Sequence, residues 1–258
     1  MKSILQATEV VKEFGPRGHR HRALDGVSLL VDEGDRIGIV GESGSGKSTL
    51  SRMLCGLDKP TAGHVELNGR EVAGMVVMRG GRRELRTQVQ YVAQDTTSSF
   101  DPRRTLLDAV TAPLRSLFDM GRDEATRRAL ELIESLELAP ALAYRRPTQV
   151  SGGQRQRFAL ARGLVVRPRI LICDEVVSAL DVSVQGTILN ILKEYCEDTG
   201  AALVFVSHGL PATAFVTEHL VVMHRGKVVE TGAARDVLRQ PTDPYTAELV
   251  AAHRGRAA

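Results

Sequence analysis

The sequence predicts an α/β protein: a core with a parallel sheet, an antiparallel β part near the start, and an inserted group of helices. Three observations lead to this prediction. A glycine-rich loop, GESGSG, separates the apolar run 36–40 from a segment of helical spacing. Strand and helix patterns alternate after residue 150. Between residues 105 and 138, apolar residues recur at helical spacing only.

The first hundred residues predict strands, one helix and two hairpins. Apolar, β-leaning runs occupy 4–14 and 21–40, and DEGD at 32–35 is interpreted as a hairpin turn between its flanking strands. STLSRMLCGL at 48–57 predicts a helix that stops at the breaker DKPTAG. HVELNGREV predicts a second hairpin with Asn68 and Gly69 at its tip.

The remaining segments predict the helical insertion and the second half of the core. Helices are expected at 105–118, 122–138 and 151–166, with Pro113 bending or interrupting the first of them. RILICDE at 169–175 predicts a buried parallel strand. A helix at 182–199 should end on Gly200, and the strand AALVFVSH should follow it.

Charge, hydropathy and cysteine spacing limit which partners and which cellular compartment are expected. The net charge of +3 gives no electrostatic case for nucleic acid, so no nucleic-acid partner is expected. No apolar run approaches the roughly 20 residues needed to cross a bilayer, so the chain is not expected to span a membrane. Cys55, Cys173 and Cys196 lie far apart in apolar patterns, which is typical of buried thiols in a cytosolic protein.

The glycine-rich loop carries the first functional signal. Gly41, Gly46, Lys47 and Ser48 fit the phosphate-loop pattern G-x-x-x-x-G-K-[ST], with Thr49 next. Glycines let backbone amides converge on an anion, and the following helix points its positive end at the same place. Lys47 should reach the β- and γ-phosphates, and Ser48 should ligate Mg²⁺. The nucleotide-binding residues predicted from the loop are Gly41, Ser43, Gly44, Ser45, Gly46, Lys47, Ser48 and Thr49.

An acidic pair supplies the second part of the site. Asp174 and Glu175 follow the apolar run ILIC, where a buried strand should end. Asp174 is expected to hold the Mg²⁺ through water, and Glu175 is expected to orient and polarise the attacking water. An acidic pair at a helix N-terminus is the alternative reading of these two residues.

The segment VSGGQRQR at 150–157 decides the class of protein. Here the chain resembles the ATP-binding subunits of ABC transporters, whose signature is typically L-S-G-G-Q, with Val150 in place of the leucine. The resemblance implies that this loop binds the γ-phosphate of ATP held by the opposite subunit. The residues carried over for that contact are Ser151, Gly152, Gly153 and Gln154, and Asp181 in SALD, which resembles the loop that crosses the dimer interface.

Three further positions match the family individually. Gln94 in YVAQD resembles the glutamine that touches the Mg²⁺ and the attacking water. His208 in FVSHGL resembles the switch histidine at the γ-phosphate, and Phe14 resembles the aromatic residue that stacks on adenine. The cofactors implied are ATP and Mg²⁺, and the catalytic residues are Glu175, His208 and Gln94.

Two departures from the family pattern lie beside this site. The family usually has Pro-Thr where this chain has Val176 and Val177, and Asp where it has Gly209. Neither change removes a group that contacts phosphate, so hydrolysis is expected to survive. Gly209 is expected to change how the histidine is held, and with it the rate.

Two other segments indicate a branch of the family. DTTSSFDPRRTLLDAVTAPL at 95–114 and PTDPYTAELV at 241–250 are similar to stretches of the subunits that energise dipeptide, oligopeptide and nickel import. Asp243 stands where histidine is common. EVVSALD favours the nickel or metallophore side. Three scattered cysteines are fewer than the four ligands of an iron–sulfur cluster, so the cluster-free subunit of such a pair is expected.

The resemblance implies partners and a location. They are transmembrane permease subunits, a second ATP-binding subunit in a homodimer or heterodimer, and, indirectly, an extracytoplasmic substrate-binding protein. The chain would act peripherally at the cytoplasmic face of the cell membrane. The permease is expected to dock a cytoplasmic helix between the core and the helical region, near Gln94 and Phe100.

One ATP-binding domain is predicted over 1–258, with core and β subdomain at 1–95 and 169–258 and a helical subdomain at 96–168. Three other functions are considered as alternatives to an importer subunit. A soluble ABC ATPase acting on DNA or ribosomes generally has a coiled-coil insertion or two fused halves. A P-loop kinase or GTPase leaves VSGGQ without a role. An exporter subunit does not account for the segments at 95–114 and 241–250.

Overall fold

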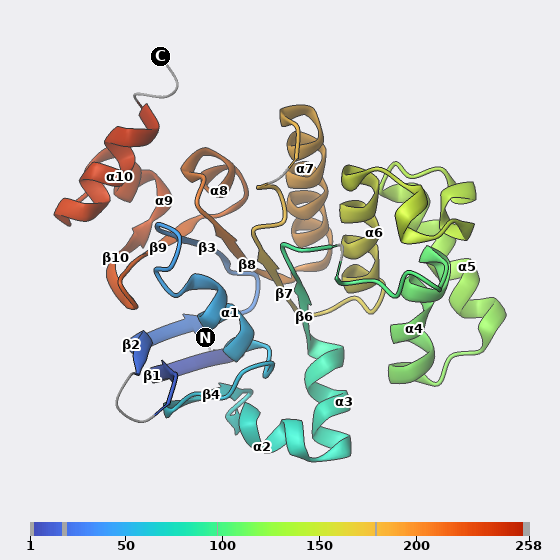
Figure 1. Cartoon of the computed structure of the whole chain (residues 1–258), viewed down its shortest axis with the longest axis horizontal. Helices are drawn as coiled ribbons and strands as arrows, with labels where there is room; N and C mark the ends of the chain where they lie inside the picture. The colour runs from blue at the N-terminus through green and yellow to red at the C-terminus, as the bar shows by residue number, and fades with distance from the viewer. Residues whose placement is uncertain (1–2, 17–19, 97, 179, 255–258) are drawn as a thin grey trace.

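Two sheets and a separate group of helices make up the structure, a computed structural model that describes residues 3–16, 20–96, 98–178 and 180–254. The sheets lie at one end of the molecule and the group of helices at the other (Figure 1). This is the α/β architecture that the sequence predicts, with its antiparallel sheet and its helical insertion.

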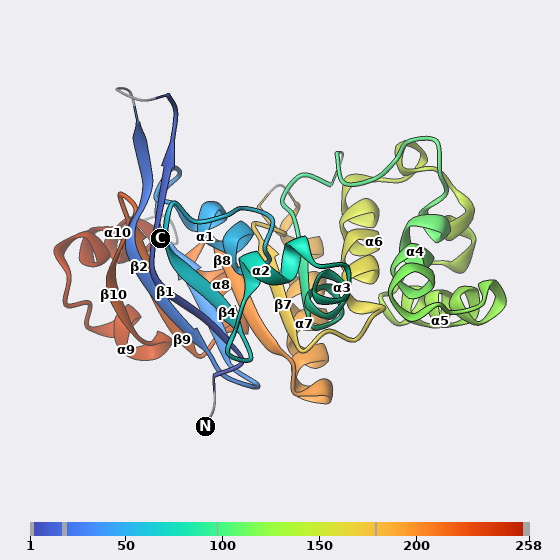
Figure 2. The ribbon, with the colours of Figure 1, turned by 90° about the horizontal axis from the view of Figure 1, so that it is seen from below.

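The smaller sheet is antiparallel, with strand order β2-β1-β4-β5. Its strands are β1 (Leu5–Phe14), β2 (His21–Val31), β4 (Ala62–Leu67) and β5 (Arg70–Glu71). β1 and β2 extend beyond the rest of the sheet as a projecting pair (Figure 2). The hairpin predicted at Asn68 and Gly69 is confirmed: both have positive φ, 52° and 75°, as a two-residue turn requires.

The larger sheet has the order β10-β9-β3-β8-β7-β6. Its strands are β3 (Arg36–Val40), β6 (Val89–Val92), β7 (Ile170–Asp174), β8 (Ala202–Ser207), β9 (His219–His224) and β10 (Lys227–Ala233). All neighbours pair in parallel except β10 with β9. The hairpin predicted at DEGD is wrong: β3 is almost wholly buried and takes β8 and β9 as partners, so 32–35 crosses from one sheet to the other.

Helix α1 (Lys47–Leu54) packs between the two sheets. Its buried Leu50, Met53 and Leu54 belong to one apolar cluster with the inner face of the small sheet and one face of the large one. Successive side chains of a strand point to opposite faces. Ile170 and Ile172 of β7 therefore join this cluster, whereas Leu171 and Cys173 join the cluster on the other face.

The helical region lies between β6 and β7 in the sequence. It contains α4 (Leu106–Phe118), α5 (Arg122–Ser135), the short 3-10 helices η1 (Pro140–Tyr144) and η2 (Pro147–Gln149), and α6 (Gly152–Leu164). α4 runs through Pro113 without interruption, supported by a capping box between Thr105 and Asp108. The subdomain boundaries expected at 95 and 169 fall in the connections outside these helices and remain a prediction.

The remaining helices were only partly predicted. α7 (Val182–Thr199) ends as expected on Gly200, which has a left-handed φ of 68°. The sequence analysis gave no prediction for α2 (Val72–Val77), α3 (Arg79–Gln88), α8 (Leu210–Val216), α9 (Ala234–Arg239) or α10 (Pro244–Arg254). Within the described part of the chain, the length and hydropathy required for crossing a membrane are not combined in any helix.

Candidate nucleotide site

The phosphate loop connects the end of β3 to the start of α1. Gly41, Gly44 and Gly46 have φ values of 151°, 81° and 102°, a region that side chains rarely adopt. A Cβ atom on Gly41 would lie 2.1 Å from the carbonyl oxygen of Met223, and one on Gly46 would lie 2.5 Å from that of Ala23. These two glycines are therefore required by close backbone approach as well as by conformation.

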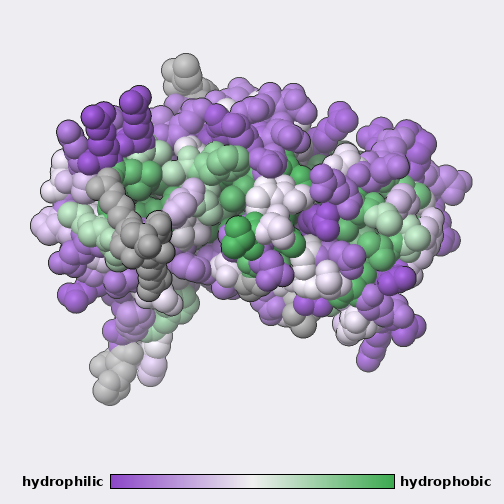
Figure 3. Space-filling view, turned by 90° about the horizontal axis from the view of Figure 1, so that it is seen from above, coloured by the Kyte–Doolittle hydropathy of each residue, from purple (hydrophilic) through white to green (hydrophobic). Residues whose placement is uncertain are grey.

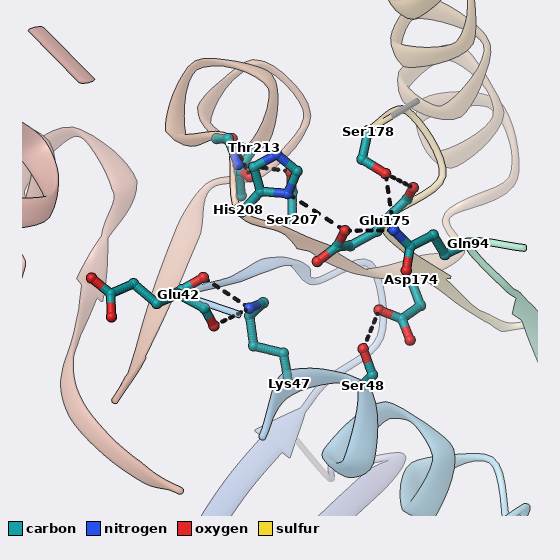
Figure 4. A network of polar contacts seen from close by, with 12 residues as sticks. Glu42, Lys47, Ser48, Gln94, Asp174, Glu175, Ser178, Ser207, His208 and Thr213 are labelled. Carbon is teal, nitrogen blue, oxygen red and sulfur yellow. Dashed lines mark hydrogen bonds and ion pairs between the residues drawn. The ribbon is translucent and has the colours of Figure 1, made fainter. Parts of the chain in front are cut away.

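Lys47, the first residue of α1, extends across this loop (Figure 4). Its Nζ donates hydrogen bonds to the carbonyl oxygens of Gly41 and Glu42, each at 2.8 Å. The residue is only 4% exposed. Burial lowers the pKa of its ammonium group, while the carboxylates of Glu175 and Asp174 oppose that shift. An ammonium group held at the loop is placed to meet a negatively charged phosphate chain.

Asp174 ends β7 and accepts hydrogen bonds at both carboxylate oxygens. The hydroxyl of Ser48 donates to Oδ1 at 3.0 Å, and the hydroxyl of Tyr91 on β6 donates to Oδ2 at 2.8 Å. Burial raises the pKa of Asp174, and the two hydrogen bonds counteract the rise. Sequence reasoning missed Tyr91, whose only signal was its place in the strand preceding Gln94.

Glu175 lies beside Asp174 and meets the other two predicted catalytic residues. Its Oε2 accepts a hydrogen bond from Nε2 of Gln94 at 3.0 Å and lies 3.4 Å from Nδ1 of His208 (Figure 4). Glu175 has a left-handed φ of 50°, and its backbone N–H donates to the carbonyl of Val206 at 2.8 Å. A left-handed φ is unfavourable for a residue other than glycine, and such strained residues are common in active sites. The side chain of Glu175 lies toward Gln94 and His208, which follow β6 and β8.

A cavity of about 380 Å³ opens over the loop. Phe14, at the end of β1, lines it together with His21, Ala23, Gln94 and Glu175. Phe14 is 44% exposed, and the Lys12 ammonium lies 5.1 Å from the centre of its ring. Other predicted nucleotide-binding residues line the same cavity, namely Ser43, Gly44, Gly46, Lys47, Ser48 and Thr49. His21 and Ala23 were not predicted.

The signature loop lies outside the described lining of this cavity. Ser151 caps α6: its hydroxyl accepts from the N–H of Gln154 at 3.2 Å, and its own N–H donates to Oε1 of Gln154 at 3.0 Å. Ser151 and Gly152 are exposed, and Gly153 packs close to Val184. Asp181, at the start of α7, is also exposed. Ser151, Gly152 and Asp181 are therefore accessible at the surface of the molecule.

The two departures from the family pattern have different surroundings. Val176 and Val177 are both 2% exposed and belong to the core shared by the large sheet and the helical region. Gly209 is held through its backbone: its N–H donates to Oγ of Ser207 at 3.0 Å, and its carbonyl accepts from Thr213 at 2.9 Å. The backbone next to His208 is therefore fixed without an acidic side chain.

The loop, its lysine and the acidic end of a buried strand define a P-loop nucleotide site, and the signature segment at the start of α6 identifies the ATP-binding cassette class. Comparison of sequences agrees with this geometry, since a model of the ABC transporter family matches residues 24–178. The chain belongs to the ABC transporter family and is one of its ATP-binding proteins.

The relatives of this chain include transport ATPases from several bacteria. It is 40% identical over 232 residues to an oligopeptide transport ATP-binding protein of Escherichia coli K12, covering 90% of this chain and 69% of that protein. It is 38% identical over 255 residues to a putative peptide import ATP-binding protein of Brucella abortus strain 2308, covering 96% and 76%.

Solved structures with the same fold include a dimeric ATP-binding cassette. That structure is in a post-hydrolysis state bound to ADP and inorganic phosphate. It superposes with a TM-score of 0.83 at 31% identity and covers 90% of this chain and 99% of its own.

Proposed function

We propose that this chain is the ATP-hydrolysing subunit of an importer, working at the cytoplasmic face of the membrane. The observation that carries the proposal is the cluster of Lys47, Ser48 and Asp174 with Glu175 next to it, on the ends of adjacent elements. Membership of the ABC transporter family and relatives named for oligopeptide transport and peptide import support it.

The donor set at the strand end fits Mg²⁺. The Ser48 hydroxyl and the Asp174 carboxylate lie 3.0 Å apart, and Gln94 adds a side-chain amide from the neighbouring strand end. Hydroxyl, carboxylate and amide oxygens are the ligands that Mg²⁺ prefers. When bound to ATP, this ion neutralises charge on the β- and γ-phosphates. Ser48, Asp174 and Gln94 are the residues that would hold it.

Glu175 is the group we assign to the attacking water. Its carboxylate, held by Gln94 and adjacent to His208, would accept the water proton as the water oxygen bonds to the γ-phosphorus. The bond from that phosphorus to the bridging oxygen breaks, which leaves ADP and inorganic phosphate. Lys47 stabilises the phosphate charge, and His208 orients the γ-phosphate. Phe14 provides the face for adenine.

A second ATP-binding subunit completes each site in this proposal. Ser151, Gly152, Gly153 and Gln154 are presented at the start of α6, where helix amides favour an anion. Figure 3 shows one face of the molecule, on which several hydrophobic areas lie among hydrophilic residues. Val182 follows Asp181 and is 84% exposed, which favours burial of this loop against a partner.

The permease would dock in a groove of about 650 Å³ between the core and the helical region. Leu57, Phe100, Arg104 and Leu117 line it together with Tyr91 and Arg162. The Arg162 guanidinium lies 4.7 Å from the centre of the Phe100 ring, and burial lowers its pKa. Of the two residues named for this docking, Phe100 lines the groove, whereas Gln94 lines the nucleotide cavity instead.

The cargo we propose is a peptide delivered by an extracytoplasmic substrate-binding protein. The names of the relatives favour peptides. The segment EVVSALD keeps nickel or a metal chelate as the second candidate. The substrate contacts would belong to the permease and the binding protein.

The test is to purify tagged Glu175→Gln protein from gently solubilised membranes in the presence of Mg-ATP. Glutamine cannot accept the proton, so we expect a closed dimer loaded with ATP, recovered with two multi-span proteins and a related or identical ATPase. Adding Lys47→Ala to this variant is the matched control, and it should lose the nucleotide-dependent dimer. Recovery with ribosomes or DNA, or normal turnover by Glu175→Gln, would count against the proposal.

A further inference from the structure

The C-terminal segment is fixed firmly to the core. The carboxylate of Glu230 on β10 accepts hydrogen bonds from the backbone N–H groups of Thr242 and Asp243 at 2.9 and 3.1 Å. Asp243 in turn caps α10, because its Oδ1 accepts from the N–H groups of Tyr245 and Thr246. The start of α10 therefore has a defined position relative to the large sheet.

Tyr245 connects this segment to the phosphate loop. Its hydroxyl oxygen accepts a hydrogen bond from the backbone N–H of Glu42 at 2.9 Å. Its ring stacks on His224 of β9, with ring centres 3.9 Å apart and planes 4° from parallel. The stacking fixes the direction of the hydroxyl. The segment 241–250, noted in the sequence only for its family resemblance, thus reaches the nucleotide site.

The hydroxyl of Tyr245 contacts the peptide unit between Gly41 and Glu42. The N–H of Glu42 and the carbonyl of Gly41 belong to the same planar group. That carbonyl accepts the hydrogen bond from Nζ of Lys47 at 2.8 Å. Rotation of the plane would break both hydrogen bonds together, so Tyr245 holds the orientation that aims the carbonyl at the lysine.

The other end of α10 reaches the loop of the switch histidine. Nε2 of His253 lies 3.1 Å from the backbone carbonyl oxygen of His208, and Nδ1 lies 2.8 Å from that of Leu249 within α10. One helix therefore touches both the loop that precedes Lys47 and the residue that faces Glu175. In between, Val250 is buried in the cluster under the helix.

We propose that α10 is a positioning element of the nucleotide site, with Tyr245 fixing the phosphate loop and His253 fixing the loop of His208. Neither residue touches the reacting atoms. The inference rests on the proposed phosphate-binding role of Lys47. The two ends of α10 have different kinetic roles: Tyr245 supports binding in ground state and transition state alike, whereas His253 supports the group that acts in the transition state.

The test compares steady-state ATP hydrolysis by the purified full chain and its variants. Tyr245→Phe keeps the ring and its stacking but lacks the hydroxyl. We expect a threefold to tenfold rise in KM and in the Kd for ATP, with kcat within about twofold, the usual effect of one lost hydrogen bond on uniform binding. Tyr195→Phe is the matched control, because Tyr195 lines a cavity between α5 and α7 away from the loop.

His253→Ala should lower kcat by about threefold to tenfold with KM within about twofold. His253→Gln keeps an amide N–H that can reach the His208 carbonyl, so it should recover most of that loss. Melting temperatures of Tyr245→Phe and His253→Gln should match the wild type, which separates positioning from loss of folding.

Three outcomes distinguish the hypotheses. If the wild type binds no ATP, or if Lys47→Ala binds it as well as the wild type, the proposed function of the loop fails. If Lys47→Ala abolishes binding but Tyr245→Phe matches Tyr195→Phe in KM and Kd, only the role of Tyr245 fails. If His253→Ala retains the wild-type kcat, α10 does not position the loop of His208.

Discussion

Tyr91 and Asp174 are joined across neighbouring strands: the tyrosine hydroxyl of β6 donates to the carboxylate at the end of β7 at 2.8 Å. Tyr91 also lines the groove proposed for the permease. One side chain therefore lies between that groove and the carboxylate assigned to the metal.

Tyr91→Phe should weaken hydrolysis most at low pH. Burial raises the pKa of Asp174, and the Tyr91 hydrogen bond counteracts this by stabilising the ionised form. Without the hydroxyl the pKa rises further. Because Asp174 must be ionised to act, activity is lost as pH falls through that pKa. The acid limb of the kcat/KM profile should move to higher pH, with about a tenfold loss of rate on the acid side.

A pH–rate profile of the full chain measures this shift, with Tyr195→Phe as control. A uniform loss of rate at every pH, with an unmoved acid limb, would show that Tyr91 acts on something other than the ionisation of Asp174.

Gly41→Ala should both destabilise the protein and abolish ATP binding. The new Cβ would meet the Met223 carbonyl oxygen at 2.1 Å, and the φ of 151° is unfavourable for alanine. We expect a loss of at least about 2 kcal/mol in the free energy of unfolding.

Gly186→Ala is the matched control for this substitution. Gly186 lies within α7, and nothing lies within 4 Å of an added Cβ. It should stabilise the protein by about 0.5–1 kcal/mol. Denaturant melts monitored by circular dichroism decide the matter, and equal stability of the two variants would contradict the tight approach at Gly41.

Comparison of Ser151→Ala with Thr105→Ala separates the loss of a helix cap from the loss of a contact with the second subunit. Both residues form capping boxes, at α6 and α4 respectively. Each alanine variant should lose about 1 kcal/mol of unfolding free energy. Only Ser151→Ala should also weaken the ATP-dependent dimer, measured in the Glu175→Gln background by light scattering. Equal dimerisation of the two variants would remove Ser151 from the proposed interface.

Gly209→Asp should fold normally and change the rate. A Cβ at Gly209 would meet only Oγ of Ser207, at 3.5 Å, and the backbone has no positive φ. We expect a free energy of unfolding within about 0.5 kcal/mol of the wild type. A carboxylate beside His208 would restrain its imidazole, so kcat should rise about twofold to tenfold. An unchanged kcat would show that the backbone contacts of Gly209 already hold the histidine.

The segments that the sequence predicted correctly have a local cause, whereas the misassigned turn depends on distant partners. Five helices, α2, α3, α8, α9 and α10, were also not predicted. The phosphate loop, the Asn68–Gly69 hairpin and the helix beginning near Ser151 follow from residues a few positions apart. The turn at 32–35 was misassigned because the choice between two sheets depends on β8 and β9, more than 160 residues further along the chain.

The same reasoning applies to the site. Motifs identify Lys47, Asp174 and Glu175, since the chemistry restricts the residue types there. Tyr91 and Tyr245 carry no such restriction, because a single hydroxyl contact leaves no pattern in the surrounding residues. Their roles emerge only when β6 and α10 are placed beside the loop and β7.

The insertion of the helical region between β6 and β7 makes the two connections unequal. The chain leaves at the carboxyl end of β6, past Gln94, and returns at the amino end of the neighbouring parallel strand β7, at the opposite end of the two strands. Of these two connections, only the outgoing one contributes a residue, Gln94, to the lining of the candidate nucleotide cavity. Any displacement of the helical region would therefore reach Gln94 and its hydrogen bond to Glu175 through the outgoing connection, and not through the incoming one.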